Sequence, residues 1–141
     1  MRLRNIAGSR DVIAESEWVI QEPCSQKGKW TEVFGNDHSI RIEIGMGKGK
    51  FLHELAKENP EINYIGIEKY SSVLLRAIQK METDPLPNLR FIRMDAEEIS
   101  EVFAEEEIDR IYLNFSHAGP LAMDPKNSDK SGQFLLPQIL H

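Results

Sequence analysis

Apolar residues recur along the middle of the chain with two different spacings. Four segments have the alternation or the short apolar run that is typical of strands; they are residues 40–44, 63–67, 89–94 and 109–115. Three segments place apolar residues on one helical face; they are residues 50–58, 70–81 and 96–104. Because strands alternate with helices, the pattern predicts an α/β fold with a parallel sheet, right-handed crossovers and helices on both faces.

The two ends of the chain do not continue this order. Residues 1–39 are predicted to be an irregular or helical lead-in that Pro23 and Gly28 interrupt. Residues 40–116 contain the predicted α/β half, and residues 117–141 form a tail that is polar and rich in breakers before a short apolar end. Doubly wound sheets add strands on the far side of the first strand, so we expect those C-terminal strands to be missing.

The junction between the first predicted strand and its helix is the most informative part of the chain. Glycine occupies every second position there, at Gly45, Gly47 and Gly49. Glycine lets the backbone turn tightly and approach a ligand closely, and the start of a helix offers N–H groups that have no partner inside the helix. The junction therefore predicts a binding site for a nucleotide-type cofactor.

The spacing of the glycines narrows the class of cofactor. A dinucleotide fingerprint, G-x-G-x-x-G, needs glycine at the position of Lys50 or of Leu52. A P-loop needs glycine at the position of Ile44 and Ser or Thr at that of Phe51. A nicotinamide-dependent oxidoreductase and a nucleotide triphosphatase are therefore disfavoured. The pattern that is present, E-x-G-x-G-x-G from Glu43, resembles the first motif of the S-adenosylmethionine-dependent methyltransferases.

Three carboxylates come at the ends of successive predicted strands, where open parallel sheets bind their ligands. Glu43 can pair with the ammonium group of the cofactor, Glu68 can accept both ribose hydroxyls, and Asp95 can accept the adenine amino group. Each residue also has an ordinary structural role open to it, as a helix-dipole partner, a surface acid and a helix N-cap respectively. The coincidence of all three at strand ends favours the cofactor site.

Longer phrases resemble one family of these methyltransferases. Over about residues 1–116 the chain is similar to the bacterial tRNA (guanine-N7-)-methyltransferases, in KGKWTEVFGNDHSIRIEIGMGKGKFLHELAKENPEINYIGIEKY, NLRFIRMDAEEI and RIYLNFS. The resemblance implies a Rossmann-like methyltransferase fold and transfer of a methyl group from S-adenosylmethionine to N7 of a guanine in the tRNA variable loop. It also implies cofactor contacts at Glu43, Gly45, Gly47, Glu68, Asp95, Ala96 and Asn114.

The resemblance breaks after the phrase NFS at residues 114–116. His117 occupies the position of an aspartate in the family, so we assign no catalytic residue. Residues 117–130 balance two lysines with two aspartates where the family is strongly basic, and SGQFL at 131–135 resembles the family again. We therefore expect a reading-frame disturbance, a truncated product and weak or no activity. The alternatives are a remnant that only binds S-adenosylmethionine and a methyltransferase of small molecules or proteins.

Composition and charge limit the partners. The net charge of −6 disfavours a uniformly basic nucleic-acid binder, so contact with tRNA needs local basic patches. The candidates are Arg2, Arg4, Arg10, Lys27, Lys29, Lys48 and Lys50. The histidines lack metal-ligand spacing, and no apolar run approaches the roughly 20 residues of a membrane span. The single cysteine, Cys24, suits a reducing compartment, so we expect a cytoplasmic protein without metal or membrane contact.

Overall fold

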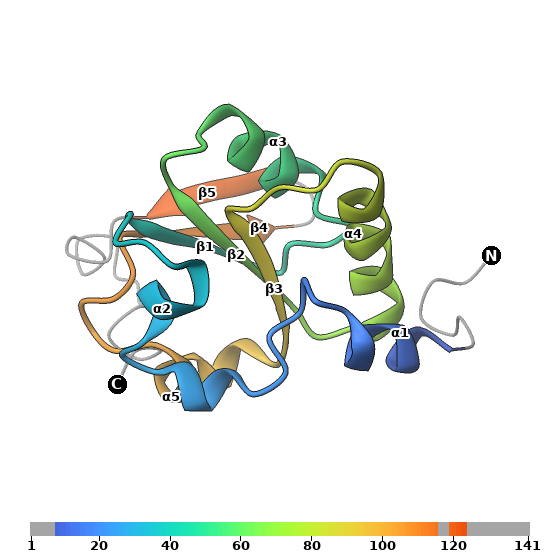
Figure 1. Ribbon diagram of the computed structural model, residues 1–141, viewed down its shortest axis with the longest axis horizontal. Helices are drawn as coiled ribbons and strands as arrows, with labels where there is room; N and C mark the ends of the chain where they lie inside the picture. Colours follow the sequence, from blue (N-terminus) through green and yellow to red (C-terminus); the bar gives the residue numbers. More distant parts are fainter. Residues whose placement is uncertain (1–7, 116–118, 124–141) are drawn as a thin grey trace.

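The described part of the chain forms a twisted sheet of five strands with helices packed around it (Figure 1). The structure, a computed structural model, describes the backbone of residues 8–115 and 119–123, and their side chains except at 9, 114, 115 and 119–123. The strands are β1 (Ile40–Ile44), β2 (Asn63–Glu68), β3 (Leu89–Arg93), β4 (Arg110–Phe115) and β5 (Gly119–Met123). Their order is β3-β2-β1-β4-β5, and β1 to β4 are parallel, as predicted for a Rossmann-like α/β fold.

The helices follow the predicted alternation. α3 (Lys50–Glu58) has the predicted bounds, and α4 (Ser71–Thr83) ends two residues later than predicted. The third predicted helix is divided into a 3-10 turn, η3 (Ala96–Glu98), and a short helix, α5 (Ile99–Val102). It ends early because Phe103 adopts an extended backbone conformation. The lead-in contains α1 (Ser9–Glu15), η2 (Pro23–Gln26) and α2 (Trp30–Phe34).

Each face of the sheet is covered by its own apolar core. Successive side chains of a strand point to opposite faces, so Tyr64 and Ile65 of β2 belong to different cores. The first core lies under α1, α3 and α4 and contains Ile78. The second lies under α2 and α5 and contains Trp30, whose indole N–H donates to the Val102 carbonyl at 2.8 Å. The prediction of helices on both faces is confirmed.

The structure corrects our expectation that regular structure ends at Phe115. Residues Gly119–Met123 form β5, which pairs antiparallel with β4 and sets Pro120 opposite Asn114. The glycine and the proline at the start of this strand are typical of turns, so the sequence pattern did not indicate a strand. An antiparallel strand needs only a short connection, whereas a further parallel strand would need a crossover. The remaining predicted tail lies outside the described residues.

The lead-in covers the outer edge of β3. Val19 forms a parallel bridge with Phe91. The Phe91 N–H donates to the Trp18 carbonyl at 2.8 Å, and the Ile20 N–H donates to the Phe91 carbonyl at 2.9 Å. An uncovered edge strand presents backbone groups to which other chains can add. The pairing therefore provides hydrogen-bond partners for part of the edge of β3, which the sequence pattern did not predict.

The strand β1 is where the winding of the sheet reverses. From β1 the chain adds β2 and β3 on one side, and it then returns to place β4 on the other side. Ligands of open α/β sheets bind outside the carboxyl ends of the strands at such a reversal. The glycine junction directly after β1 lies at this point.

Candidate cofactor site

The glycine junction bends back over the end of β2. The N–H groups of Gly45 and Met46 both donate to the Ile67 carbonyl, at 2.9 and 3.1 Å. Gly45 has φ 72° and Gly47 has φ 62°, in the left-handed region that side chains with a Cβ rarely adopt. The bend therefore requires glycine at these positions, which explains the spacing of the motif.

Glu68, the last residue of β2, holds the glycine junction in place. One carboxylate oxygen, Oε1, accepts the Gly47 N–H at 3.0 Å, and Oε2 accepts the Tyr70 N–H at 3.1 Å. The side chain is only 7% exposed, so the surface-acid alternative for Glu68 is wrong. A carboxylate oxygen has two lone pairs. Each oxygen therefore keeps one acceptor site after its bond to the backbone.

Glu43 is the most unusual group of the site. It is fully buried in β1, and neither of its carboxylate oxygens has a hydrogen-bond partner among the described residues. Burial and then the charge of Glu68 raise the pKa of Glu43 to about 8. At neutral pH the carboxyl group is therefore mostly protonated in the protein without ligand.

No interaction within the described residues stabilises the buried carboxyl group of Glu43. Arg41 pairs with Asp109 and Lys57 with Asp84, whereas neither carboxylate oxygen of Glu43 has a hydrogen-bond partner among the described residues. Burying an unpaired polar or charged group costs several kcal/mol by general estimates, ~2–7 for a neutral one. A cationic ligand bound at the glycine turn would provide the partner that this buried acid lacks. The residues present therefore fit a cofactor that carries an ammonium group.

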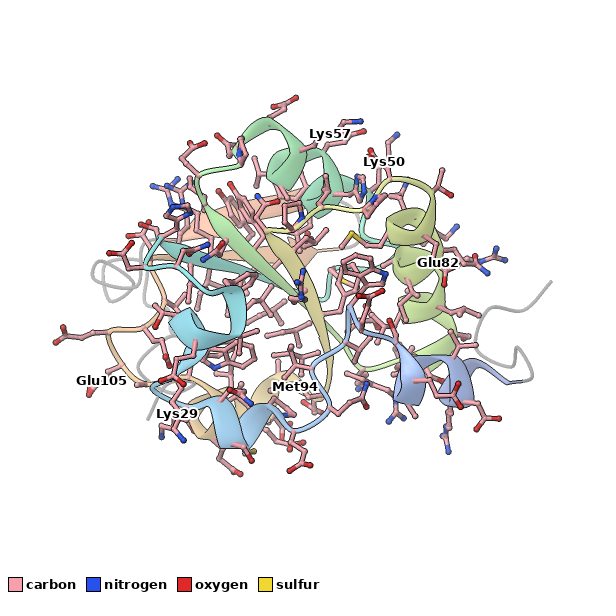
Figure 2. All side chains as sticks on the ribbon, in the orientation of Figure 1. Lys29, Lys50, Lys57, Glu82, Met94 and Glu105 are labelled. Atoms are coloured by element: carbon pink, nitrogen blue, oxygen red, sulfur yellow. The ribbon has the colours of Figure 1, made fainter. Side chains whose placement is uncertain are left out.

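A cavity of about 420 Å³ opens where β2 and β3 end. Figure 2 labels one of its lining residues, Met94, just past the end of β3. Tyr70 forms another part of the lining and is 39% exposed, and the Lys69 ammonium lies 5.4 Å from the centre of its ring. The remaining lining residues are Arg93, Asp95 and Glu98. The cavity thus combines an aromatic ring and an apolar side chain with groups of both charges, which suits a nucleoside.

Asp95 has a structural role in this structure. Its Oδ1 accepts the Glu97 N–H at 3.0 Å, which makes Asp95 the N-cap of η3. The N-cap alternative from the sequence is therefore correct. Its other oxygen, Oδ2, has no hydrogen bond within the described residues, so the cap leaves one carboxylate oxygen for a ligand.

Six of the seven predicted residues form two neighbouring groups. Glu43, Gly45, Gly47 and Glu68 lie around the glycine junction. Asp95 and Ala96 follow β3, and Asp95 faces the cavity. Asn114 belongs to β4, which pairs with β1 on the side away from β2. The side chain of Asn114 and the whole of His117 lie outside the described residues.

Three residues that follow Glu68 were not predicted from the sequence to be unusual. Lys69 and Tyr70 line the cavity, and their position directly after Glu68 was a signal that we did not use. Ser72, in the first turn of α4, is fully buried, and its hydroxyl has no hydrogen-bond partner among the described residues. No sequence signal distinguishes such a serine from an ordinary helix residue.

Metal ligands and membrane spans are both absent from the described residues. No three His, Cys, Asp or Glu side chains gather there in a group that could hold a metal ion. No helix in the same part of the chain has the length and apolar character of a membrane span.

The chain is similar to known methyltransferases in sequence. A family model described as "Putative methyltransferase" matches residues 37–120. A tRNA (guanine-N(7)-)-methyltransferase of Lachnoclostridium phytofermentans is 58% identical over 135 residues, which are 96% of this chain and 63% of that protein. The protein of the same name from a Geobacillus species is 54% identical and covers 85% of this chain and 55% of its own length. The chain therefore spans a little over half the length of these curated relatives.

Solved structures agree on the fold. A methyltransferase described as antibiotic-related is 27% identical, with a TM-score of 0.54 over 62% of this chain and 46% of that one. A protein of Methanococcus maripaludis, described as a "putative s-adenosyl-l-methionine-dependent methyltransferase", is 16% identical, with a TM-score of 0.52 over 82% of this chain and 52% of its own, and supports the fold alone. With the family match, the glycine junction and the buried acids, the chain belongs to the methyltransferase family of the bacterial tRNA (guanine-N7-)-methyltransferases.

Proposed function

We propose that the chain binds S-adenosylmethionine and serves in methyl transfer to N7 of a guanine in the variable loop of tRNA. The single observation that carries this proposal is the buried, unpartnered carboxyl group of Glu43 beside the glycine junction. The names of the relatives supply the substrate, because each is a tRNA (guanine-N(7)-)-methyltransferase. As the chain spans only part of their length, the activity and the tRNA partner are proposals.

Each part of the proposed cofactor has a complementary group in the chain. Glu43 provides a carboxyl group that releases its proton when the ammonium group binds beside it, and the backbone at Gly45 and Gly47 leaves room for close approach. Glu68 provides its two remaining acceptor sites for the ribose hydroxyls. Asp95 provides Oδ2 for the adenine amino group. We assign the backbone around Ala96 and Asn114 to the rim of the same site.

The proposed reaction requires little acid–base catalysis by the protein. Bound S-adenosylmethionine supplies a methyl group on a positively charged sulfur, which keeps the bonding electron pair when the methyl group leaves. N7 of guanine carries an in-plane lone pair, so no proton has to be removed before attack. The protein therefore contributes mainly alignment of the reactants and electrostatic stabilisation. Glu68 contributes to alignment by fixing the glycine junction through Gly47.

The site also has to accommodate the charge that methylation leaves on the guanine. A carboxylate near the base favours this positive charge, and the resemblance to the family implies an aspartate at the position of His117. Histidine provides no negative charge there. We therefore expect slower methyl transfer by this chain than by its relatives, with cofactor binding less affected.

A pair of measurements on the purified chain tests the proposal. Calorimetric titration with S-adenosylmethionine measures cofactor binding, and incorporation of a labelled methyl group into tRNA transcripts measures transfer. The product nucleoside is identified by mass spectrometry as 7-methylguanosine. Binding and 7-methylguanosine together support the function. Binding without any transfer favours a protein that only binds the cofactor, and absence of binding refutes the assignment of the site.

The compartment follows from the proposed partner. tRNA and the unpaired, exposed Cys24 both fit the cytoplasm, where thiols stay reduced. We propose that the chain acts there.

A further inference from the structure

A second cavity, of about 210 Å³, lies between the lead-in and the end of β3. Its charged lining residues are Arg10 of α1 and Arg93 of β3, and we name it the Arg10–Arg93 cavity. Figure 1 shows α1 next to the end of β3 at which the cofactor site opens. The sequence identifies Arg10 as a candidate for a basic patch, and the fold places Arg93 in the same cavity.

The Arg10–Arg93 cavity differs in charge from the cofactor cavity. Among the described residues no aspartate or glutamate lines it, whereas Asp95 and Glu98 line the cofactor cavity. Both arginines are exposed, and neither guanidinium group has an ion pair or a hydrogen bond within the described residues. In a chain with a net charge of −6 this is a local positive site. Guanidinium groups bind phosphate oxygens with two parallel hydrogen bonds, so the natural ligand is a phosphate group.

The floor of the cavity is apolar. It includes the exposed Ala14 and the half-buried Ile20 and Pro23, with the buried Ile13 and Val19 beneath them. An inorganic ion would gain nothing from these side chains, whereas a ribose or a base attached to the phosphate would cover them. The combination fits one nucleotide of a nucleic-acid strand better than a free anion.

The Arg10–Arg93 cavity adjoins the cofactor site. Arg93 lines both cavities, so a strand bound at one passes directly beside the other. We propose that the Arg10–Arg93 cavity binds a backbone phosphate of an RNA strand, with its sugar and base on the apolar floor. The inference rests on the proposed function, because that function makes RNA the partner of this face.

The test uses the full 141-residue chain and a short single-stranded oligoribonucleotide. The variant Arg10→Gln/Arg93→Gln removes two positive charges from exposed side chains. The control Lys57→Gln/Lys80→Gln removes two charges from exposed side chains elsewhere; Figure 2 labels Lys57 away from α1, beside α3, and Lys80 lies in the last turn of α4. We expect about tenfold weaker RNA binding by the arginine variant than by the control, and a salt dependence reduced by roughly one to two phosphate contacts. In NMR titrations of the unsubstituted chain, Ile13, Val19 and Ile20 shift first.

Several results would overturn the site. Equal RNA binding by the two variants contradicts it, and so do NMR shifts confined to other surfaces. Competition by a polyaspartate peptide at the same concentration as the oligonucleotide would indicate a general anion site instead.

Methyl transfer to tRNA, measured in parallel, separates this inference from the proposed function. RNA binding that needs both arginines, without any methyl transfer, supports the cavity and refutes the function. Methyl transfer that the arginine substitutions leave unchanged supports the function and refutes the cavity.

Discussion

The acids at the end of β1 and β2 differ from the acid at the end of β3 in how the fold uses them. Glu43 is fully buried and has no hydrogen-bond partner in the described part of the chain. Asp95 is half-buried and caps η3 through the Glu97 N–H. Glu68 is intermediate, because it is buried but accepts two backbone N–H groups.

Because of this difference, the three acids are unequal as evidence for a ligand. A cap explains Asp95 without any cofactor, since an aspartate at that place stabilises a helix start by itself. No such explanation exists for Glu43, whose burial raises its pKa and costs stability. Of the three predicted acids, Glu43 therefore supports the cofactor site most strongly and Asp95 least strongly. The following experiments test this ranking.

The largest expected effect is on the pH dependence of stability. The pKa of Glu43 is raised from 4.5 to about 8 in the folded chain, so between these values the folded state holds a proton that the unfolded state has released. The contribution of Glu43 therefore makes stability fall as pH rises, by about 1.4 kcal/mol per pH unit at most. Glu43→Gln removes this slope. Denaturant unfolding between about pH 5 and about pH 8 measures the free energy of unfolding of the unsubstituted chain and of the variant.

The difference between the two unfolding curves isolates Glu43 from the other titrating groups. We expect equal stability of the two proteins near the lower pH and a more stable variant near the upper one. A variant that is less stable at both ends would mean that Glu43 has a partner that stabilises it.

The second effect is on cofactor affinity. Glu43→Gln keeps the shape of the side chain but cannot carry the charge that pairs with an ammonium group, so we expect roughly 100-fold weaker binding of S-adenosylmethionine. Calorimetry measures the affinity, with Glu54→Gln on the exposed side of α3 as the matched control. Affinity unchanged from that of the control would show that the ligand does not use this acid.

A smaller effect is expected at Glu68. Glu68→Ala leaves the N–H groups of Gly47 and Tyr70 without their acceptor, at a cost of about 1–3 kcal/mol in stability. We expect about tenfold weaker cofactor binding, because the glycine junction is less ordered. Hydrogen exchange measures the order of the junction at the Gly47 amide. An amide that exchanges as slowly as in the unsubstituted chain would contradict this role of Glu68.

The smallest effect is expected at Asp95. Asp95→Asn keeps an acceptor for the cap, so stability stays within a few tenths of a kcal/mol, whereas Asp95→Ala loses about 1 kcal/mol. The neutral amide that Asp95→Asn introduces is a weaker acceptor for the adenine amino group than a carboxylate, so we expect about fivefold weaker cofactor binding by this variant. Thermal unfolding and calorimetry separate the two roles. If Asp95→Asn binds the cofactor normally, Asp95 is a cap alone.

Much of the architecture was predictable from local patterns. The spacing of apolar residues predicted β1 and α3 with the bounds that the structure has. It overestimated the helix after Asp95, because a short amphipathic pattern does not specify whether a 3-10 turn or an α-helix forms. It missed β5, whose first residues are typical of turns, and it missed the pairing of Val19 with the edge of β3.

Local residue patterns were sufficient to specify the strand, the glycine turn and the helix, since side-chain periodicity and the positive φ of glycine are properties of neighbouring residues. Only the tertiary structure decided what the acids and arginines do. It left Glu43 without a partner among the described residues, joined Glu68 to Gly47 and set Arg10 in one cavity with Arg93. Burial and contacts between residues far apart in the chain arise when the sheet assembles, so no local pattern records them.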